Sequence, residues 1–352
     1  PDDIFLTCQD YYHEKLEPLF FEQLNTQKSE RKKEFANDFI PFLNGGLFET
    51  LNLDYYEWNG ISSKYINMLK VDDNFFSELY EHLDQFNFTI DENSIEDSDL
   101  SIDPEMLGRI FENLLAEINP ETSQNARKST GSYYTPREIV EYMVNSSLLE
   151  YLKTKTDIHD EVLKSIIFKN QEPLHDYEKS DILKAISKLK ILDPACGSGA
   201  FPMGLLQKIV KILNLMDEDA SIWFGLQTKE FRETHKNRNK DYIRKLSIIK
   251  NTIYGIDIQP IAIEISKLRF FLSLIVDEDG EPEPLPNLEF KFVCANSLLP
   301  LYEGKTDSYK NFVKELQLLK DEYFESSGKR KKEIVKEYLA KRDSYLKNIN
   351  EF

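Results

Sequence analysis

The sequence has few of the residues that build disulfide frameworks, metal centres or membrane anchors. Its three cysteines, Cys8, Cys196 and Cys294, are far apart and form no C-x-x-C pair, and its five histidines form no H-x-x-x-H pair. No apolar run is long enough to span a bilayer. These absences argue against a disulfide frame, a metal site and a membrane protein, and they favour reduced thiols in a cytoplasmic protein.

Basic residues are also scarce, since 44 Lys and Arg stand against 62 Asp and Glu, which gives a net charge of -18. Such a charge opposes binding to a phosphate backbone. The imbalance is uneven, however: residues 1–125 contain 27 acidic and 8 basic residues, whereas residues 126–352 contain 35 and 36. The acidity therefore belongs to one part of the chain, and the remainder is close to neutral.

The length of 352 residues is enough for about two domains of ordinary size. We expect an acidic, mainly helical domain at 1–125, an α/β domain at 126–300, and a charged helical hairpin at 301–352. The boundary is placed in the almost apolar-free segment 119–131, which is typical of an exposed linker. Because the chain begins with Pro1 rather than Met, we expect it to be a piece of a longer protein.

The second domain repeats a pattern of strand, tight turn and helix. Strands are predicted at 188–193, 252–257 and 289–294, with helices at 200–213 and 260–275, and a basic insertion separates the first two units at about 217–247. Strands that alternate with helices indicate parallel β-α-β units. The predicted fold class is therefore a doubly wound, Rossmann-like α/β domain.

A glycine-containing turn, Asp193-Pro-Ala-Cys-Gly-Ser-Gly199, follows the first predicted strand, where open parallel sheets bind their ligands. In dinucleotide enzymes this turn approaches a pyrophosphate, which a carboxylate at its entrance would repel. Asp193 instead suits a ligand with a positively charged amino group. S-adenosylmethionine, with its methionyl ammonium, is such a ligand.

The ends of the next two strands offer further groups for a nucleoside. A carboxylate at Asp257 can accept hydrogen bonds from two ribose hydroxyls, and Ile258 can pack against an adenine ring. Asn296, followed by Ser297, offers a side-chain amide for the edge of that ring. The alternatives are structural: Asp257 can cap the helix that begins at Pro260, and Asn296 can form a turn.

Before these strands, Thr135-Pro-Arg-Glu138 has the spacing of a capping box, with proline at the first helical position. Apolar residues follow on a helical period from Ile139 to Leu148. A helix is therefore predicted to begin at Thr135.

Four motifs in this order resemble the cofactor motifs of adenine-N6 DNA methyltransferases. They are Thr130–Pro136, Asp193–Phe201, Gly255–Pro260 and Ala295–Leu298. Their order is similar to that of the gamma class, and in particular of type IIG restriction-modification methylases and related phage-defence enzymes. Upstream, Leu43–Glu49 and Pro104–Leu115 look like the helical region that precedes the methylase domain in those enzymes.

The resemblance implies S-adenosylmethionine as the cofactor and a role for each matching residue. Tyr134 and Thr135 would close over the methionyl end, the glycine turn would hold it, and the later strand ends would hold the ribose and adenine. The full predicted binding set is Tyr134, Thr135, Asp193, Ala195, Cys196, Gly197, Gly199, Asp257, Ile258, Asn296 and Ser297. No metal is implied.

One motif of that family is missing. Its members have an Asn-Pro-Pro-aromatic motif that binds a flipped adenine, but the only Asn-Pro here is Asn119-Pro120, followed by Glu121. We therefore predict no catalytic residue in this chain. The chain would be the inactive, truncated cofactor-binding part of a parent enzyme that methylates adenine in double-stranded DNA.

Two other functions remain open. A nucleotide-dependent oxidoreductase would need to bind NAD, against which Asp193 argues. A non-catalytic scaffold or interaction module would keep the same fold without using the cofactor.

Overall fold

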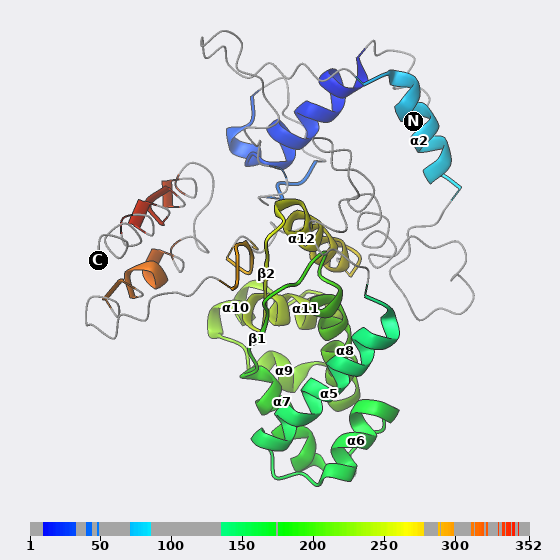
Figure 1. Cartoon of the computed structure of the whole chain (residues 1–352), viewed down its shortest axis with the longest axis vertical. Coiled ribbons are helices and arrows are strands. Elements are labelled where there is room, and N and C mark those ends of the chain that lie inside the picture. Colours follow the sequence, from blue (N-terminus) through cyan, green and yellow to red (C-terminus); the bar gives the residue numbers. More distant parts are fainter. Residues whose placement is uncertain are drawn as a thin grey trace.

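The computed structural model describes residues 10–32, 40–43, 48, 71–85, 135–173, 175–277, 288 and 290–298, together with scattered positions between 311 and 344 (Figure 1). Among the predictions made above, the segment Pro104–Leu115, the linker 119–131 and Tyr134 lie outside these residues. The boundary between the first two domains therefore stays a prediction.

The described part of the N-terminal region is mainly helical. It contains two π-helical segments, η1 (Tyr12–Leu16) and η2 (Pro18–Leu24), a 3-10 turn, η3 (Lys28–Glu30), and the helix α2 (Asp73–Leu83). Asp72 caps α2, because its side chain accepts a hydrogen bond from the Asn74 N–H. The rings of Tyr11 and Phe76 pack with centroids 5.2 Å apart, which joins η1 to α2.

Three parallel strands form the sheet, in the order β1 (Ile191–Asp193), β2 (Ile253–Asp257) and β3 (Phe292–Cys294). Asp193 pairs in register with Gly255, and Asp257 pairs with Cys294. The predicted parallel β-α-β arrangement is thus confirmed. Because parallel strands end at the same edge, the last residues of all three strands lie at one edge of the sheet.

Two strands begin later than their alternating sequence predicts. Lys188, expected to start β1, is the C-cap of the preceding helix, where its N–H donates to the carbonyls of Ala185 and Ile186. Before β3, the N–H groups of Lys291 and Phe292 both donate to the carbonyl of Leu288, so this segment turns instead of extending. In both places backbone N–H groups donate to carbonyls a few residues earlier in a local turn, so they do not form the hydrogen bonds of a longer strand.

Helices pack beside the sheet (Figure 1): α5 to α7 precede β1, α8 to α11 lie between β1 and β2, and α12 lies between β2 and β3. Their bounds are α5 Arg137–Lys155, α6 Asp160–Lys169, α7 Asp176–Ser187, α8 Ala200–Met216, α9 Ser221–Gly225, α10 Lys229–Thr234, α11 Lys240–Asn251 and α12 Pro260–Ile275. The predicted bounds of α12 are confirmed, and α8 is three residues longer than predicted. The basic insertion predicted between the first two units is helical, as α9, α10 and α11.

The helix at the second domain's start departs from its prediction. It begins at Arg137 and not at Thr135, and Pro136 is its N-cap residue. No side chain caps it, so the capping box predicted from Thr135 and Glu138 is wrong. Instead, the carbonyl of Pro136 accepts the first hydrogen bonds of the helix, from the N–H groups of Ile139 and Val140.

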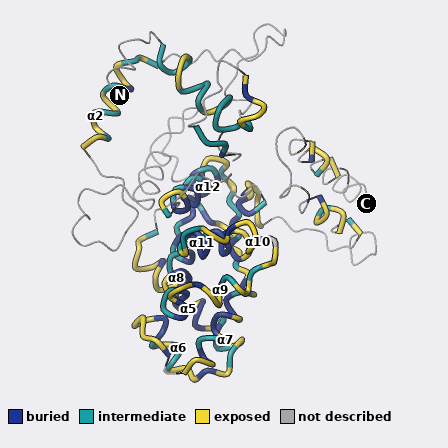
Figure 2. The backbone as a smooth tube through the Cα atoms, turned by 180° about the vertical axis from the view of Figure 1, so that it is seen from behind, coloured by how far each residue is buried: buried dark blue, intermediate teal, exposed yellow. Residues whose placement is uncertain are grey.

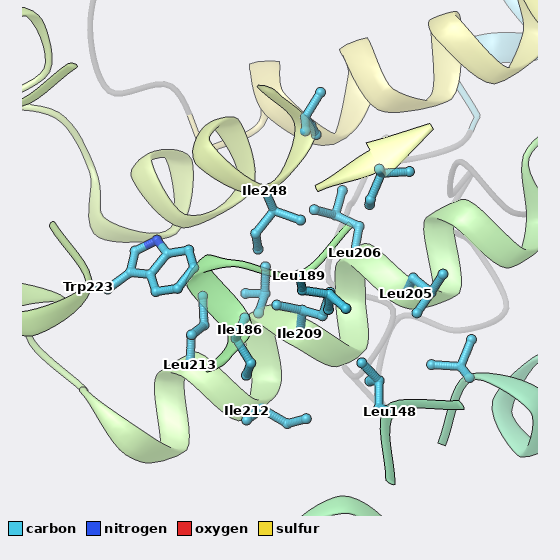
Figure 3. Close-up of a cluster of buried hydrophobic side chains, with 14 of the residues drawn as sticks. Leu148, Ile186, Leu189, Leu205, Leu206, Ile209, Ile212, Leu213, Trp223 and Ile248 are labelled. Carbon is cyan, nitrogen blue, oxygen red and sulfur yellow. The ribbon is translucent and has the colours of Figure 1, made fainter. Parts of the chain in front are cut away.

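One continuous apolar core joins these helices to the strands (Figures 2 and 3). Leu148 of α5, Leu206 and Ile209 of α8, and Ile248 of α11 are each at most 2% exposed, and Trp223 closes one side of the cluster. The indole N–H of Trp223 donates to the hydroxyl of Ser247, so its polar atom is also satisfied. Full burial of each such side chain contributes about 1.5–3 kcal/mol to folding.

Smaller clusters connect the flanking regions. Leu43 and Phe48 of the N-terminal region pack against Phe271 of α12, and the two phenylalanine rings meet edge to face at 6.1 Å. In the C-terminal region, Leu319 and Ile334 form a buried pair. Leu43 and Phe48 of the segment Leu43–Glu49 are thus buried against α12.

Arg330, in the basic segment Lys329-Arg-Lys-Lys332, lies among acidic side chains. Arg330 forms ion pairs with Glu322 at 2.6 Å and Glu337 at 3.1 Å. Within the described part of the chain, no helix is long and apolar enough to cross a membrane.

Candidate functional site

The turn from Pro194 to Gly199 connects β1 to α8 at the edge where the strands end. Two of its residues, Gly197 (φ 53°) and Gly199 (φ 87°), have left-handed backbone conformations that side chains disfavour. A Cβ atom at Gly199 would also lie 2.9 Å from the Ser266 hydroxyl oxygen of α12. The sequence therefore needs glycine at 199 both for its conformation and for the close approach of α12.

The N–H groups of this turn donate within the protein. The bonds are Ala195 N to Asp193 Oδ1 at 3.0 Å, Cys196 N to the Ile256 carbonyl at 2.9 Å, Gly197 N to Asp257 Oδ2 at 2.8 Å, and Gly199 N to the Cys196 carbonyl at 2.8 Å. Turns that bind phosphate instead direct several N–H groups at the anion. This turn therefore lacks the donors that a pyrophosphate would need at these four positions.

Asp193, at the entrance of the turn, has one carboxyl oxygen that accepts a hydrogen bond and one that does not. Its Oδ1 accepts from the Ala195 N–H, but its Oδ2 is buried and has no hydrogen-bond partner among the described residues. Burial raises the pKa of the carboxyl above its usual value, the Ala195 N–H opposes this, and the negative charge of Asp257 adds to it. A cationic donor placed at Oδ2 would satisfy the atom and favour its charged form.

Asp257 has the equivalent position at the end of β2, but both of its oxygens accept bonds from the main chain. Oδ2 accepts from the Gly197 N–H at 2.8 Å, and Oδ1 accepts from the Gln259 N–H at 2.9 Å. Each carboxylate oxygen has a second lone pair, so further donors can still bind. The side chain therefore links the second strand end to the glycine turn in the protein itself.

The remaining predicted residues of this edge are exposed. Ile258 is 60% exposed, and Asn296 and Ser297 are also exposed beyond the end of β3. The side-chain oxygen of Asn296 accepts from the Leu298 N–H at 3.0 Å, so Asn296 forms a turn. The Ala295 N–H donates to the Asp257 carbonyl at 2.9 Å, which holds this segment beside β2.

Cys196 lies inside the turn, close to both carboxyl groups. It is 4% exposed, and burial together with the charges of Asp193 and Asp257 raises the pKa of its thiol to about 12. The thiol is therefore neutral at ordinary pH. This agrees with a small turn residue and not with a nucleophile.

An apolar hollow of about 410 Å³ reaches this site from the side of α5. Met143 and Leu148 of α5 face it, and Leu192, Asp193 and Pro194 form part of its wall. The sequence predicted an apolar helical period for α5 but no part of it in the site, and Met143 is 48% exposed. An apolar side chain on α5 that is half-exposed, such as Met143, is the signal that could have indicated this hollow.

A larger hollow of about 720 Å³ lies near the start of β1, where Lys188 and Lys190 form part of its wall. Its wall contains none of the predicted binding residues. We place the candidate site at the smaller hollow, because its wall includes Asp193 and Pro194, the first residue of the glycine turn.

The structure brings most of the predicted set together. Asp193, Ala195, Cys196, Gly197, Gly199 and Asp257 are linked by the hydrogen bonds above, and Ile258, Asn296 and Ser297 follow the adjacent strand ends. Thr135 precedes α5, and no described contact joins it to the glycine turn. Among the described residues, no three His, Cys, Asp or Glu side chains are grouped as a metal site would require.

Two residues at this site were missed. Ser266 and Arg269 of α12 donate hydrogen bonds to the carbonyls of Gly197 and Ser198, both at 2.9 Å. They are polar residues three positions apart in an otherwise mostly apolar helix, and this spacing places them on one face.

No protein-family model matches the chain. The chain is 30% identical, over 372 aligned residues, to a protein of Methanocaldococcus jannaschii (strain ATCC 43067) whose name is "Putative type II restriction enzyme and methyltransferase". The alignment covers 96% of this chain but 28% of that relative. The chain thus spans little more than a quarter of the length of the protein it resembles.

Proposed function

We propose that this chain is the S-adenosylmethionine-binding part of an adenine-N6 DNA methyltransferase of a restriction-modification or phage-defence system. The similarity to the relative named above supports a methyltransferase of a restriction-modification system. The adenine specificity rests on the motif order alone. The parent enzyme would transfer a methyl group to a flipped adenine in double-stranded DNA.

The single observation on which the proposal depends is the unsatisfied Oδ2 atom of Asp193. A buried carboxylate oxygen without a donor costs free energy, and a ligand ammonium would remove that cost. Asp193 lies at the carboxyl end of a parallel strand, which is where such sheets bind ligands. The residues present therefore fit the methionyl end of S-adenosylmethionine.

The same geometry disfavours a dinucleotide. The N–H groups of Ala195, Cys196, Gly197 and Gly199 already donate within the protein, and two carboxyl groups border the turn. A pyrophosphate would meet repulsion there and few donors. An NAD-dependent oxidoreductase is therefore the weaker proposal.

The other residues would place the nucleoside. We propose that Asp257 accepts the ribose hydroxyls with its remaining lone pairs, and that exposed Ile258 covers one face of the adenine. The amide nitrogen of Asn296 would donate to the ring edge, because its oxygen is already used in a turn. When bound, the cofactor supplies a methyl group on a positively charged sulfur, which an amino nitrogen of adenine can attack directly.

We expect this chain to bind the cofactor without transferring its methyl group, because its sequence contains no Asn-Pro-Pro-aromatic motif. The chain's own contribution would then be binding and orientation, which lower the barrier by fixing the methyl donor in place. A radiolabel assay with unmethylated DNA should show no transfer by this chain alone.

Titration calorimetry with S-adenosylmethionine, S-adenosylhomocysteine and NAD tests the proposal. We expect saturable binding of the first two ligands and no heat with NAD. Absence of binding at millimolar S-adenosylmethionine and S-adenosylhomocysteine would overturn it.

A second candidate is a non-catalytic scaffold module with the same fold. It is favoured by the internal bonds of Asp257 and Asn296, which give both side chains a structural role without any ligand. The unsatisfied Asp193 oxygen is the observation that favours the cofactor site over this candidate. Unchanged function of the parent protein with Asp193→Ala would favour the scaffold.

A further inference from the structure

Two polar side chains of α12 hold the glycine turn through its carbonyl groups. The hydroxyl of Ser266 donates to the Gly197 carbonyl at 2.9 Å. The Arg269 guanidinium donates through Nη1 to the Ser198 carbonyl at 2.9 Å and lies 3.5 Å from the Ser198 hydroxyl oxygen. The carbonyls of two neighbouring turn residues, Gly197 and Ser198, are therefore bonded to two side chains that lie on the same face of α12.

Both side chains are deeply buried, since Ser266 is 0% and Arg269 is 4% exposed. Burial of a guanidinium costs free energy unless its N–H groups are hydrogen-bonded. An apolar side chain at position 269 would avoid that cost and could pack in the core. A chain that needed α12 only for its core would gain nothing from an arginine here. The bonds point to a requirement for a defined turn conformation.

The Gly197 peptide is held on both sides. Its N–H donates to Asp257, which ends β2, and its carbonyl accepts from Ser266, which belongs to the helix after β2. The left-handed conformations of Gly197 and Gly199 are easily lost in a free turn, because glycine has wide conformational freedom. Fixing the two carbonyls removes much of that freedom.

We propose that Ser266 and Arg269 are positioning residues of the cofactor site. They touch no ligand, but they fix the turn so that Asp193 and the peptide beside it keep the geometry that the methionyl end requires. This inference rests on the proposed function. It adds the requirement that affinity for the cofactor depends on the α12 side of the turn as well as on the strand ends.

Ser266→Ala and Arg269→Gln test the inference in the 352-residue chain. Two matched controls come from the same structure. Ser273→Ala removes another buried serine hydroxyl of α12, which donates to the Phe270 carbonyl at 2.9 Å. Arg244→Gln alters an arginine that is 2% exposed and donates to the Glu218 carbonyl at 2.9 Å.

Three measurements are made on each variant: the dissociation constant for S-adenosylhomocysteine, the unfolding transition in urea, and hydrogen exchange of the turn amides. We expect Ser266→Ala to weaken binding by about three- to tenfold, and Arg269→Gln by about tenfold. Exchange at Gly197 and Gly199 should become faster in both. The controls should shift the urea transition to a similar extent but leave affinity and turn exchange unchanged.

Equal affinities in Ser266→Ala and Ser273→Ala would overturn the inference, because a merely structural loss leaves a folded protein's affinity unchanged. If Arg269→Gln does not fold, Ser266→Ala decides alone. If the unmodified chain binds no S-adenosylhomocysteine, the proposed function fails and the positioning role at a cofactor site fails with it. Binding by the unmodified chain with no loss in Ser266→Ala would overturn the positioning role only.

Discussion

The ends of β1 and β2 place the same side chain at equivalent positions, yet the two carboxyl groups have different surroundings. Asp257 accepts main-chain bonds with both oxygens and so completes the protein's own structure. Asp193 leaves one buried oxygen without a partner in the described structure, at an energetic cost. The carboxyl group at the second strand end is thus bonded within the protein, whereas the one at the first keeps a buried acceptor, which is where we propose that the ligand ammonium binds.

Asp193→Asn should produce the largest effect, because it removes the charge that faces the proposed ammonium. A hydrogen bond between charged groups contributes about 1.5–3 kcal/mol, so the affinity for S-adenosylmethionine should fall by about 10- to 100-fold. Calorimetry measures this. Asp181→Asn, at a half-exposed position on α7, is the charge-matched control and should bind as the unmodified chain does. Equal affinity in both variants would remove the proposed distinction between the strand ends.

Asp257→Asn should act mainly on stability. An asparagine has one acceptor oxygen, so the bond to either Gly197 or Gln259 is lost, and the free energy of unfolding should fall by about 1–2 kcal/mol. Urea denaturation of the ligand-free chain measures the change. A variant as stable as the unmodified chain would show that Asp257 is not the structural member of the pair.

The charged form of Asp193 should lower the stability of the folded chain, so replacing Asp193 should raise stability at neutral pH, whereas replacing Asp257 lowers it. Because its pKa is raised in the folded chain, the protonated form favours folding. That contribution is present below the pKa of the unfolded chain, about 3.9, and is lost as the pH rises through the folded value. Asp193→Asn should therefore raise the melting temperature at pH 7–8, and the gain should vanish near pH 3.5. A lower melting temperature at pH 7 would contradict this.

The smallest effect concerns Cys196, which reports on both carboxyl groups. Its pKa of about 12 and its burial predict that iodoacetamide at pH 8 leaves it unmodified in the folded chain. Exposed Cys294 should react, and both should react in urea. Mass spectrometry of the peptides gives the extent of modification. Reaction of Cys196 at the rate of Cys294 would show that the turn opens readily.

Some of these features could be predicted from local sequence. Pro260 at the first position of α12 and the apolar residues that follow define that helix correctly. The parallel direction of the strands follows from the alternation of strands and helices. The predicted strands were too long because Lys188 and Lys291 continue an alternating pattern but belong to a helix C-cap and a turn.

Other features depend on contacts between distant residues. Nothing near Asp193 in the sequence shows that its Oδ2 is unsatisfied, and the bonds of Ser266 and Arg269 to the turn join residues about 70 positions apart. The capping box failed for a local reason, since proline took the N-cap position itself. Spacing indicates which groups share an edge, but only the fold decides which of them are already bonded.

The packing of Phe48 on Phe271 has a practical consequence for dividing this protein. Phe271 belongs to α12, whose residues Ser266 and Arg269 hold the glycine turn, and it is 6% exposed while Leu43 and Phe48 cover it. A shortened protein that started at residue 126 would expose this ring to water and invite self-association. Leu43 and Phe48 thus cover a residue of the helix that supports the proposed cofactor site, so a shortened protein should retain both of them.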